Sequence, residues 1–272
     1  MSAETTSDTA IASREPHHRV GPKVFGLNFA IETQEEMLRA LTCEPARATG
    51  PRLLVTANLD HIVTLRRNAA FREAYADAWR VTSDGAPVFL YARIRGAAIR
   101  ERVTGSDLFA AWCERVRPEE HRVFLLASNP VTAEKIRIHF LSRGFGAEAV
   151  TVEVPPFGFE CDEEYSRALV ERVRGARATH LVMGVGAPKS EIWAHSHRDR
   201  LGPLYVLCVG ASIEFFTGDK ARAPAWVGRL GLEWLHRFAS EPRRLFHRYF
   251  VRSWAFLAAI ADDLRAPRKA GR

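Results

Sequence analysis

Short apolar runs of strand length alternate with helical patterns along most of this chain of 272 residues. We predict five buried strands from these runs, at residues 52–57, 122–127, 149–154, 179–183 and 204–209. Helices are predicted after the first four of them, at residues 62–76, 129–143 and 163–174 and from Pro188 onward. Strands that alternate with helices at this spacing favour an α/β fold, a parallel sheet with helices on both faces. Ligands of such sheets bind beyond the carboxyl ends of the strands.

The chain is long enough for one sizeable core and a small appended element. Residues 1–19 are polar and lack an apolar run, so we expect a disordered leader and not a signal peptide. Residues 20–221 hold the predicted α/β domain, and residues 222–272 form a C-terminal appendage. No stretch approaches the roughly 20 consecutive apolar residues that a membrane-spanning helix needs.

Four cysteines lie far apart without the spacing of metal ligands, at positions 43, 113, 161 and 208. Each has hydrophobic neighbours, so we expect all four to be buried free thiols. Free thiols are typical of a reducing cytosol.

The appendage carries all of the excess positive charge. From Arg222 onward there are eleven Arg and Lys residues against four Asp and Glu, whereas the first 221 residues are neutral overall. Arg237, Arg244 and Arg248 stand among aromatic residues at helical spacing. This pattern predicts a basic amphipathic helical element, which either packs on the core with its arginines outward, or meets lipid phosphates, or closes over the site and binds a diphosphate. A nucleic-acid-binding module is the alternative that charge alone leaves open.

Polar residues follow the first predicted strand in the segment 56–61 (TANLDH). Thr56 and Asn58 offer neutral hydrogen-bonding groups that suit sugar hydroxyls or a uracil. Asp60 and His61 stand at the start of the next helix. The alternative is that Thr56 or Asn58 only caps that helix.

Asp84 lies in a turn rich in Gly and Pro, at residues 81–87 (VTSDGAP). An Asp before Gly is commonly a turn former, but a carboxylate near a strand end can also act as a general base toward a hydroxyl. Arg95, Arg100 and Arg102 follow, and they either neutralise a diphosphate or form a solvated basic face.

Gly184 and Gly186 belong to the segment 184–189 (GVGAPK), between a predicted strand and a helix. Glycines there let backbone N–H groups approach an anion, and Lys189 adds a positive charge. The segment matches neither the dinucleotide fingerprint nor the Walker loop, so a plain tight turn is equally compatible with it.

Several classes of site are missing from the sequence. There is no His, Cys and carboxylate set with zinc spacing, no DxD pair that would hold a metal on a nucleotide sugar, and no nucleophile motif. A leaving diphosphate would therefore be stabilised by arginines, backbone amides and a helix dipole. A nucleotide-dependent oxidoreductase on the same kind of sheet is a second alternative, but it would need a glycine fingerprint and an acidic ribose ligand.

Together these segments resemble the bacterial WecG/TagA/CpsF glycosyltransferase family, which includes N-acetylmannosaminyl-, N-acetylmannosaminuronyl- and glucosyltransferases. The resemblance covers roughly residues 23–255. Its motifs are Thr56-x-Asn58 with Asp60-His61, Asp84-Gly85, Arg102-Val-Thr-Gly105, Gly184-x-Gly-x-Pro-Lys189 with Glu191 and Trp193, and the segment 233–249 with Arg237, Arg244 and Arg248. It implies a Rossmann-like core and metal-independent, inverting sugar transfer from a UDP-sugar to a polyprenyl-diphosphate-linked acceptor, without a cofactor.

The resemblance assigns roles to single residues. Asp84 matches the proposed catalytic base, Thr56 and Asn58 match residues of a substrate pocket, and Arg102 matches an active-site arginine. Ser190 stands where the family usually has Gln, which leaves the donor sugar open among UDP-ManNAc, UDP-ManNAcA and UDP-Glc types. The C-terminal arginines match an element that touches the membrane and completes the site.

We therefore expect a cytoplasmic glycosyltransferase of cell-surface polysaccharide biosynthesis, peripheral on the inner face of the bacterial membrane. Its expected partners are a UDP-sugar, a lipid-linked acceptor and an anionic membrane surface, with no nucleic acid. Since the family often forms oligomers, a homo-oligomer is also expected.

Overall fold

The computed structural model describes residues 21–46, 50–220 and 252–266. Its sheet has six strands in the order β2-β1-β6-β5-β3-β4, and every neighbouring pair is parallel. The strands are β1 (Arg52–Ala57), β2 (Arg80–Ser83), β3 (Val123–Leu126), β4 (Val150–Glu153), β5 (His180–Met183) and β6 (Tyr205–Cys208). The predicted parallel α/β sheet is confirmed, and each of the five predicted strands is present.

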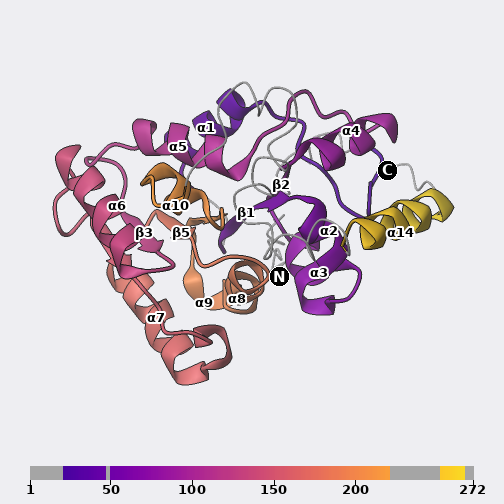
Figure 1. Ribbon diagram of the computed structural model, residues 1–272. Coiled ribbons are helices and arrows are strands. Elements are labelled where there is room, and N and C mark those ends of the chain that lie inside the picture. The colour runs from indigo at the N-terminus through magenta and orange to yellow at the C-terminus, as the bar shows by residue number, and fades with distance from the viewer. Residues whose placement is uncertain (1–20, 47–49, 221–251, 267–272) are drawn as a thin grey trace, which may run out of the picture.

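Helices lie on both faces of the sheet, which gives the Rossmann-like architecture seen in Figure 1. They are α1 (Gln34–Cys43), α2 (Leu59–Leu65), α3 (Ala69–Ala76), α4 (Ala86–Ile94), α5 (Gly105–Arg115), α6 (Pro130–Ser142), α7 (Glu163–Gly175), α8 (Lys189–Ser196), α9 (Arg198–Leu201), α10 (Ser212–Phe216) and α14 (Arg252–Arg265), with a 3₁₀ turn η1 (Phe159–Cys161). Within the described ranges, no helix is both long and apolar enough to span a bilayer.

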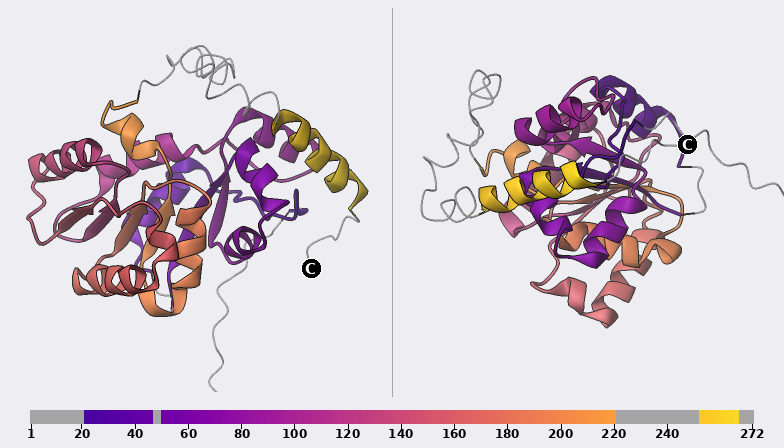
Figure 2. Two further views of the ribbon diagram at one scale, coloured as in Figure 1. Left: turned by 60° about the horizontal axis from the view of Figure 1, so that its bottom comes forward. Right: turned by 90° about the vertical axis from the view of Figure 1, so that its right-hand side faces the viewer.

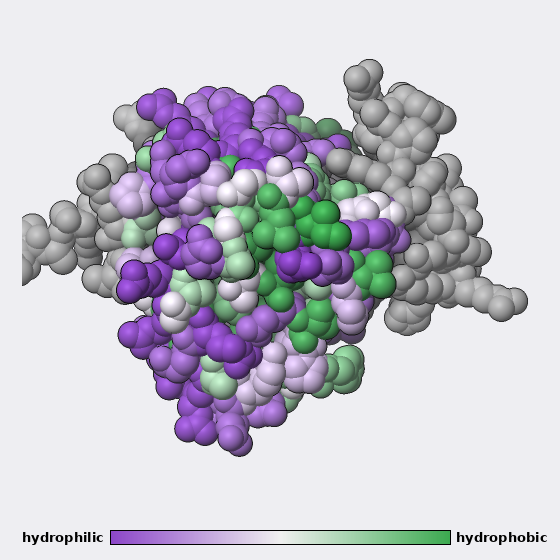
Figure 3. Space-filling view, turned by 90° about the vertical axis from the view of Figure 1, so that its left-hand side faces the viewer, coloured by the Kyte–Doolittle hydropathy of each residue, from purple (hydrophilic) through white to green (hydrophobic). Residues whose placement is uncertain are grey.

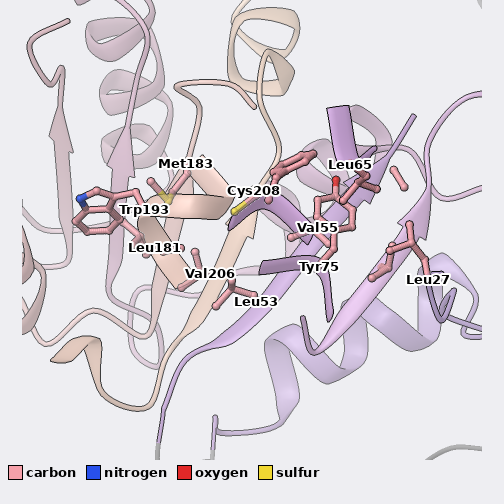
Figure 4. Packing of buried hydrophobic residues seen from close by; sticks show 14 of the residues in the cluster. Leu27, Leu53, Val55, Leu65, Tyr75, Leu181, Met183, Trp193, Val206 and Cys208 are labelled. Atoms are coloured by element: carbon pink, nitrogen blue, oxygen red, sulfur yellow. The ribbon is translucent and has the colours of Figure 1, made fainter. Parts of the chain in front are cut away.

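Alternate residues of the four central strands, β1, β6, β5 and β3, belong to two separate cores, because successive side chains of a strand point to opposite faces. Leu53 and Val55 of β1 pack with Tyr75 of α3 and Trp193 of α8 in one core, which Figure 4 shows. Leu54, between them, packs in the other core, with buried residues of α1, α5 and α6. The central strands are therefore apolar on both faces, as expected for a buried parallel sheet.

The sequence analysis missed one strand and predicted one helix where the structure has two. The strand β2 was not predicted, because its four residues RVTS include a charge and run directly into the Asp84-Gly85 turn. The predicted helix over residues 62–76 is two helices, since Asn68 caps a new helix by accepting a hydrogen bond from the N–H of Phe71. This helix start could have been predicted from the sequence, because Asn is a common N-cap residue.

The prediction of four buried cysteines is half wrong. All four are free, and Cys113 and Cys208 are buried, whereas Cys43 and Cys161 are exposed. Cys43 is the last residue of α1 and Cys161 the last of η1, so both stand at element ends that face solvent. Hydrophobic neighbours in the sequence did not distinguish these ends from the core.

The amino-terminal edge of the sheet holds the end of α1. Three carbonyls of its last turn accept hydrogen bonds from buried side chains: Ala40 from the Tyr205 hydroxyl (3.0 Å), Leu41 from Nε2 of His180 (2.8 Å) and Thr42 from Nε2 of His121 (3.2 Å). These carbonyls have no partner within a helix, so the side chains replace water there. Burial, opposed by the bond to Leu41, lowers the pKa of His180 from 6.5 to about 3, which keeps its ring neutral.

The described part of the C-terminal appendage packs against the α/β domain. Helix α14 lies along its outside, next to α2 (Figure 2). Phe256 and Ala259 are buried, and the buried carboxylate of Asp263 accepts hydrogen bonds from the Tyr91 hydroxyl (2.8 Å) and from Nε of Arg95 (2.9 Å). The predicted C-terminal helix is therefore present at residues 252–265. The predicted leader at 1–19 and the segment 222–251 lie outside the described residues.

Candidate active site

The register of β1 and β2 brings Asn58 and Asp84 together. Ala57 and Ser83 are paired at the ends of these strands, so the next residue of each strand emerges at the carboxyl edge. The N–H of Asp84 donates to the carbonyl of Ala57 (2.9 Å), and a Cβ placed on Gly85 would lie 3.8 Å from that of Asn58. Two residues 26 positions apart in the sequence thus form one corner of the edge.

Asp84 is half-buried immediately before α4, whose N-cap is Gly85. Gly85 has φ +101°, a conformation that favours glycine. Asp84 is also near Tyr75: burial raises the pKa of the Tyr75 phenol well above its ordinary value, and the charges of Glu191, Cys208 and Asp84 add to that rise. The candidate base is therefore held by a fixed backbone turn beside an enclosed network of ionisable groups.

Asn58 does cap α2, as the simpler of the two interpretations held. Its Oδ1 accepts from the N–H of His61 (3.2 Å), which leaves the two amide N–H donors for another partner. Nδ1 of His61 contacts the carbonyl of Thr56 and the Tyr75 hydroxyl (3.0 Å), and that hydroxyl also donates to the Thr56 carbonyl (2.7 Å). The start of α2 is thus fixed around the end of β1. Asp60 lies half-buried in its first turn.

The segment from Arg102 to Gly105 reaches the same edge. A Cβ on Gly105 would lie 3.3 Å from Cγ2 of Thr56 and 3.2 Å from the hydroxyl of Ser212, so α5 begins between the ends of β1 and β6. Thr104 caps α5 through the N–H of Asp107 (3.1 Å). The buried Thr56 side chain is therefore in contact with the start of α5.

The three arginines of the sequence analysis have different surroundings. Arg95 is bound to Asp263, and Arg100 donates to the Ile31 carbonyl (2.7 Å) and contacts Glu36. Arg102 is half-buried, and within the described part of the chain it has no hydrogen-bond or ion-pair partner. It is thus the best placed of the three to bind an anion.

The structure explains why positions 184 and 186 are glycines. A Cβ on Gly184 would lie 2.5 Å from Cδ1 of Ile213 and 2.9 Å from the carbonyl of Leu126, so no larger residue fits between β5 and α10. Gly186 has φ +87°, and its carbonyl accepts from the buried Ser190 hydroxyl (2.9 Å). The loop is thus a tight turn, and anion binding by its backbone N–H groups remains a proposal.

Lys189 and Glu191, two residues apart at the start of α8, differ in environment. Nζ of Lys189 lies 5.9 Å from the ring centroid of Phe157, at a half-buried position. Glu191 is 2% exposed, and its Oε2 has no hydrogen-bond partner in the described structure. Burial, opposed by a hydrogen bond from its own backbone N–H, raises the pKa of Glu191 from 4.5 to about 7.

The structure adds residues that the sequence analysis did not select. Glu214, on α10 after β6, accepts from the hydroxyl of Ser128 after β3 (2.9 Å) and from Nζ of Lys220 (2.9 Å). Phe157 is fully exposed in the loop after β4. Both follow strand ends, so the rule that ligands bind at this edge was the available signal. Polar and aromatic groups thus line the edge from β2 to β4.

Two predicted features fall outside this description. Arg237, Arg244 and Arg248 lie outside the described residues. Among the described residues, no group of three or more His, Cys, Asp or Glu side chains is arranged to hold a metal ion.

Comparison with known proteins gives one family. The model described as "Glycosyl transferase WecG/TagA/CpsF family" matches residues 22–270. The chain is 25% identical over 219 residues to the N-acetylglucosaminyldiphosphoundecaprenol N-acetyl-beta-D-mannosaminyltransferase of Bacillus spizizenii, across 79% of this chain and 81% of that enzyme. It is 23% identical over 227 residues to the enzymes of the same name from Staphylococcus aureus strains MW2 and COL, across 82% of this chain and 85% of each.

Proposed function

This chain belongs to the WecG/TagA/CpsF family of glycosyltransferases, and from that premise we propose that it moves one sugar from a UDP-sugar to a polyprenyl-diphosphate-linked saccharide. The names of its relatives support N-acetylglucosaminyl-diphosphoundecaprenol as the acceptor and an N-acetylmannosaminyl group as the sugar transferred. The product would serve cell-surface polysaccharide biosynthesis. We place the enzyme on the cytoplasmic face of the membrane, where UDP-sugars are made.

The observation that carries this proposal is the juxtaposition of Asp84 and Asn58 at the carboxyl edge of the sheet. A half-buried carboxylate beside an amide provides a proton acceptor next to a group that can hold a sugar hydroxyl. Arg102 lies in the segment that leads into α5 at the same edge, and Lys189 opens α8 after β5. Cationic groups are what a departing nucleoside diphosphate requires.

The proposed reaction is a single displacement. Asp84 takes the proton from the acceptor hydroxyl as that oxygen forms a bond to the anomeric carbon. The bond from this carbon to the diphosphate oxygen breaks on the opposite face, so the configuration inverts and UDP leaves with the bonding electrons. Arg102 and Lys189 would neutralise the charge that develops on the leaving diphosphate, without a metal ion or a cofactor.

Thr56, Asp60 and His61 are assigned to positioning. The hydrogen bonds between Thr56, His61 and Tyr75 fix the start of α2, whose N-cap is Asn58 and whose first turn holds Asp60. We propose that Gly184, Gly186 and Ser190 set the shape of their loop and make no side-chain contact with the donor. The Ser190 hydroxyl donates to the Gly186 carbonyl of that loop, and we propose that it does not select the donor sugar.

We also propose that Arg237, Arg244 and Arg248 bind either lipid phosphates or the substrate diphosphate, as the charge of the appendage indicates. Replacing all three by Gln would then weaken binding to anionic vesicles, slow transfer to lipid-linked acceptors, or both. This substitution is a cleaner test than truncation at Arg222, because truncation also removes Asp263 from its contact with Arg95.

The function is tested with the purified full-length chain, a panel of UDP-sugars and a short-chain GlcNAc-diphospholipid. The mass of the product identifies the sugar transferred. In buffer that contains a chelator, we expect one UDP-hexosamine or UDP-hexose to give a product that is larger than the acceptor by a single sugar. A product formed equally well from every donor, or no product from any donor, would contradict the assignment.

A further inference from the structure

Five large apolar side chains are exposed on two helices, α4 and α14. Leu90 (56% exposed) and Ile94 (79%) are one turn apart on α4. Trp254 (75%), Leu257 (54%) and Leu264 (58%) are on α14. We call these five residues the α4–α14 apolar face. Exposed apolar groups gathered in this way commonly mark an interaction surface.

The two helices are held together by buried polar contacts. Tyr91 of α4 and Arg95, the residue that caps the carboxyl end of α4, both bind Asp263 of α14. The Tyr91 hydroxyl also lies 3.5 Å from the carbonyl of Ile260. The side chains of Arg95 and Asp263 are 11% and 5% exposed, so this connection is shielded from solvent. The relative position of α4 and α14 is therefore fixed.

Leu257 and Leu264 lie on the flank of α14 next to Ile260, whose carbonyl is 3.5 Å from the Tyr91 hydroxyl of α4. Leu257, Ile260 and Leu264 share one stripe, since residues three and four apart are neighbours on a helix. The other flank faces α2, where Arg66 binds Asp262 (2.6 Å) and the Ala255 carbonyl (3.2 Å). Helices α4 and α14 lie on the same side of the molecule (Figure 1), and Tyr91 of α4 contacts Ile260 and Asp263 of α14.

The surroundings of this face are positively charged. Arg93 on α4, Arg67 after α2 and Arg265 at the end of α14 are exposed. The acidic groups nearby, Asp262 and Asp263, are each paired with an arginine. Arginines around exposed apolar side chains are the pattern of a surface that binds an anionic bilayer.

The apolar face begins next to the candidate base. Helix α4 is capped by Gly85, the residue after Asp84. At 1.5 Å per residue, Leu90 and Ile94 lie about 8 and 14 Å from that cap along the helix axis. A sugar joined to a lipid by a diphosphate stays within a short distance of the headgroups. A membrane at the far end of α4 would thus present its acceptor hydroxyl to Asp84.

We propose that the α4–α14 apolar face rests on an anionic bilayer, with Leu90 and Ile94 entering the headgroup layer beside the active site. This inference rests on the proposed function, because the lipid-linked acceptor is the reason for a membrane there. It goes further in placing the contact on α4, a helix of the catalytic domain itself, and not on the basic appendage alone.

The test compares two double variants of the full-length chain in sedimentation with lipid vesicles. Leu90→Ser with Ile94→Ser changes the proposed face. Val131→Ser with Ile138→Ser is the matched control, since these residues are 60% and 53% exposed. They belong to α6, at the left of Figure 1, which is the side that faces the viewer in Figure 3. On vesicles that contain half phosphatidylglycerol, the α4 variant should bind at least about tenfold more weakly than the unmodified chain. The α6 variant should bind as tightly as the unmodified chain.

Transfer to a water-soluble short-chain acceptor shows that each variant is folded, and it should be unchanged in both. The inference is overturned if the α4 variant binds vesicles like the unmodified chain, or if both variants lose binding equally. It is also overturned if light scattering shows that the α4 variant breaks a dimer while vesicle binding persists, because a second copy then covers the face. Failure of every UDP-sugar as donor would refute the proposed function, whereas selective loss of vesicle binding would still support the membrane face.

Discussion

Replacing Glu191 by Gln should reveal a dependence of the free energy of unfolding on pH. In the unmodified chain this dependence is cancelled by the titration of Glu191. Glu191 has a pKa of 4.5 unfolded and about 7 folded. A group whose folded pKa is raised stabilises the fold below its unfolded value and loses that contribution as the pH rises through the folded value. At pH 7 the ionisable carboxyl therefore costs about 3 kcal/mol relative to a permanently neutral side chain, and at pH 5 it costs about 1 kcal/mol.

His180 acts in the opposite direction. Its pKa falls from 6.5 to about 3 on folding, so the unfolded chain binds the proton first and stability decreases as the pH falls below 6.5. From pH 7 to pH 5 this loss is about 2 kcal/mol, and it depends only on the folded pKa lying well below 5. The contributions of Glu191 and His180 nearly cancel between pH 5 and 7 in the unmodified chain.

Urea unfolding of both chains at pH 5, 6 and 7 measures these contributions. The stability of the Glu191→Gln variant relative to the unmodified chain should increase by about 2 kcal/mol from pH 5 to pH 7, on top of a constant offset from burying an amide. The variant itself should be about 2 kcal/mol less stable at pH 5 than at pH 7 because of His180. A difference between the two chains that does not change with pH would refute the reasoning for Glu191.

Three further outcomes follow from the packing and charges. Gly184→Ala should destabilise the fold by about 1–3 kcal/mol in thermal or urea unfolding, because its Cβ would meet Ile213; an unchanged midpoint would contradict the close packing. Asp263→Asn should cost about 3–5 kcal/mol and expose α14 to protease, since Arg95 would be left buried without its charge partner; equal protection of both chains would refute this role. Arg102→Gln should lower kcat/KM by about tenfold or more with little loss of stability; unchanged kinetics would remove Arg102 from the diphosphate site.

The sequence predicted the sheet well because parallel strands buried on both faces are apolar throughout. Residues 52–57 became β1 with the same bounds. Strand β2 was missed because its strand character comes from pairing with β1, along which Thr82 lies opposite Thr56. A four-residue segment that begins with Arg carries little pattern of its own, so only the partner strand identifies it.

The candidate site was predictable in its residues but not in its arrangement. The residue types at Asp84 and Asn58 and the turn residues around them were visible in the sequence. The proximity of Asp84 to Asn58 depends on the β1–β2 register, which the sequence does not show. The family resemblance distinguished Arg102 from Arg95, whereas the residues alone did not. Asp263, which binds Arg95, lies 168 positions away, so the structural role of Arg95 is visible only in the folded chain.

In the proposed mechanism, the Asp84 carboxylate after β2 accepts the proton of the acceptor hydroxyl. The decisive measurement is the single-turnover rate of Asp84→Asn with saturating donor and acceptor. The control is Asp199→Asn, which changes a carboxylate that is 87% exposed on α9. The rate should fall by about 10²–10⁴-fold for Asp84→Asn, with an unchanged unfolding midpoint, and should not change for Asp199→Asn. A fully folded Asp84→Asn variant that transfers sugar at the unmodified rate would contradict the account.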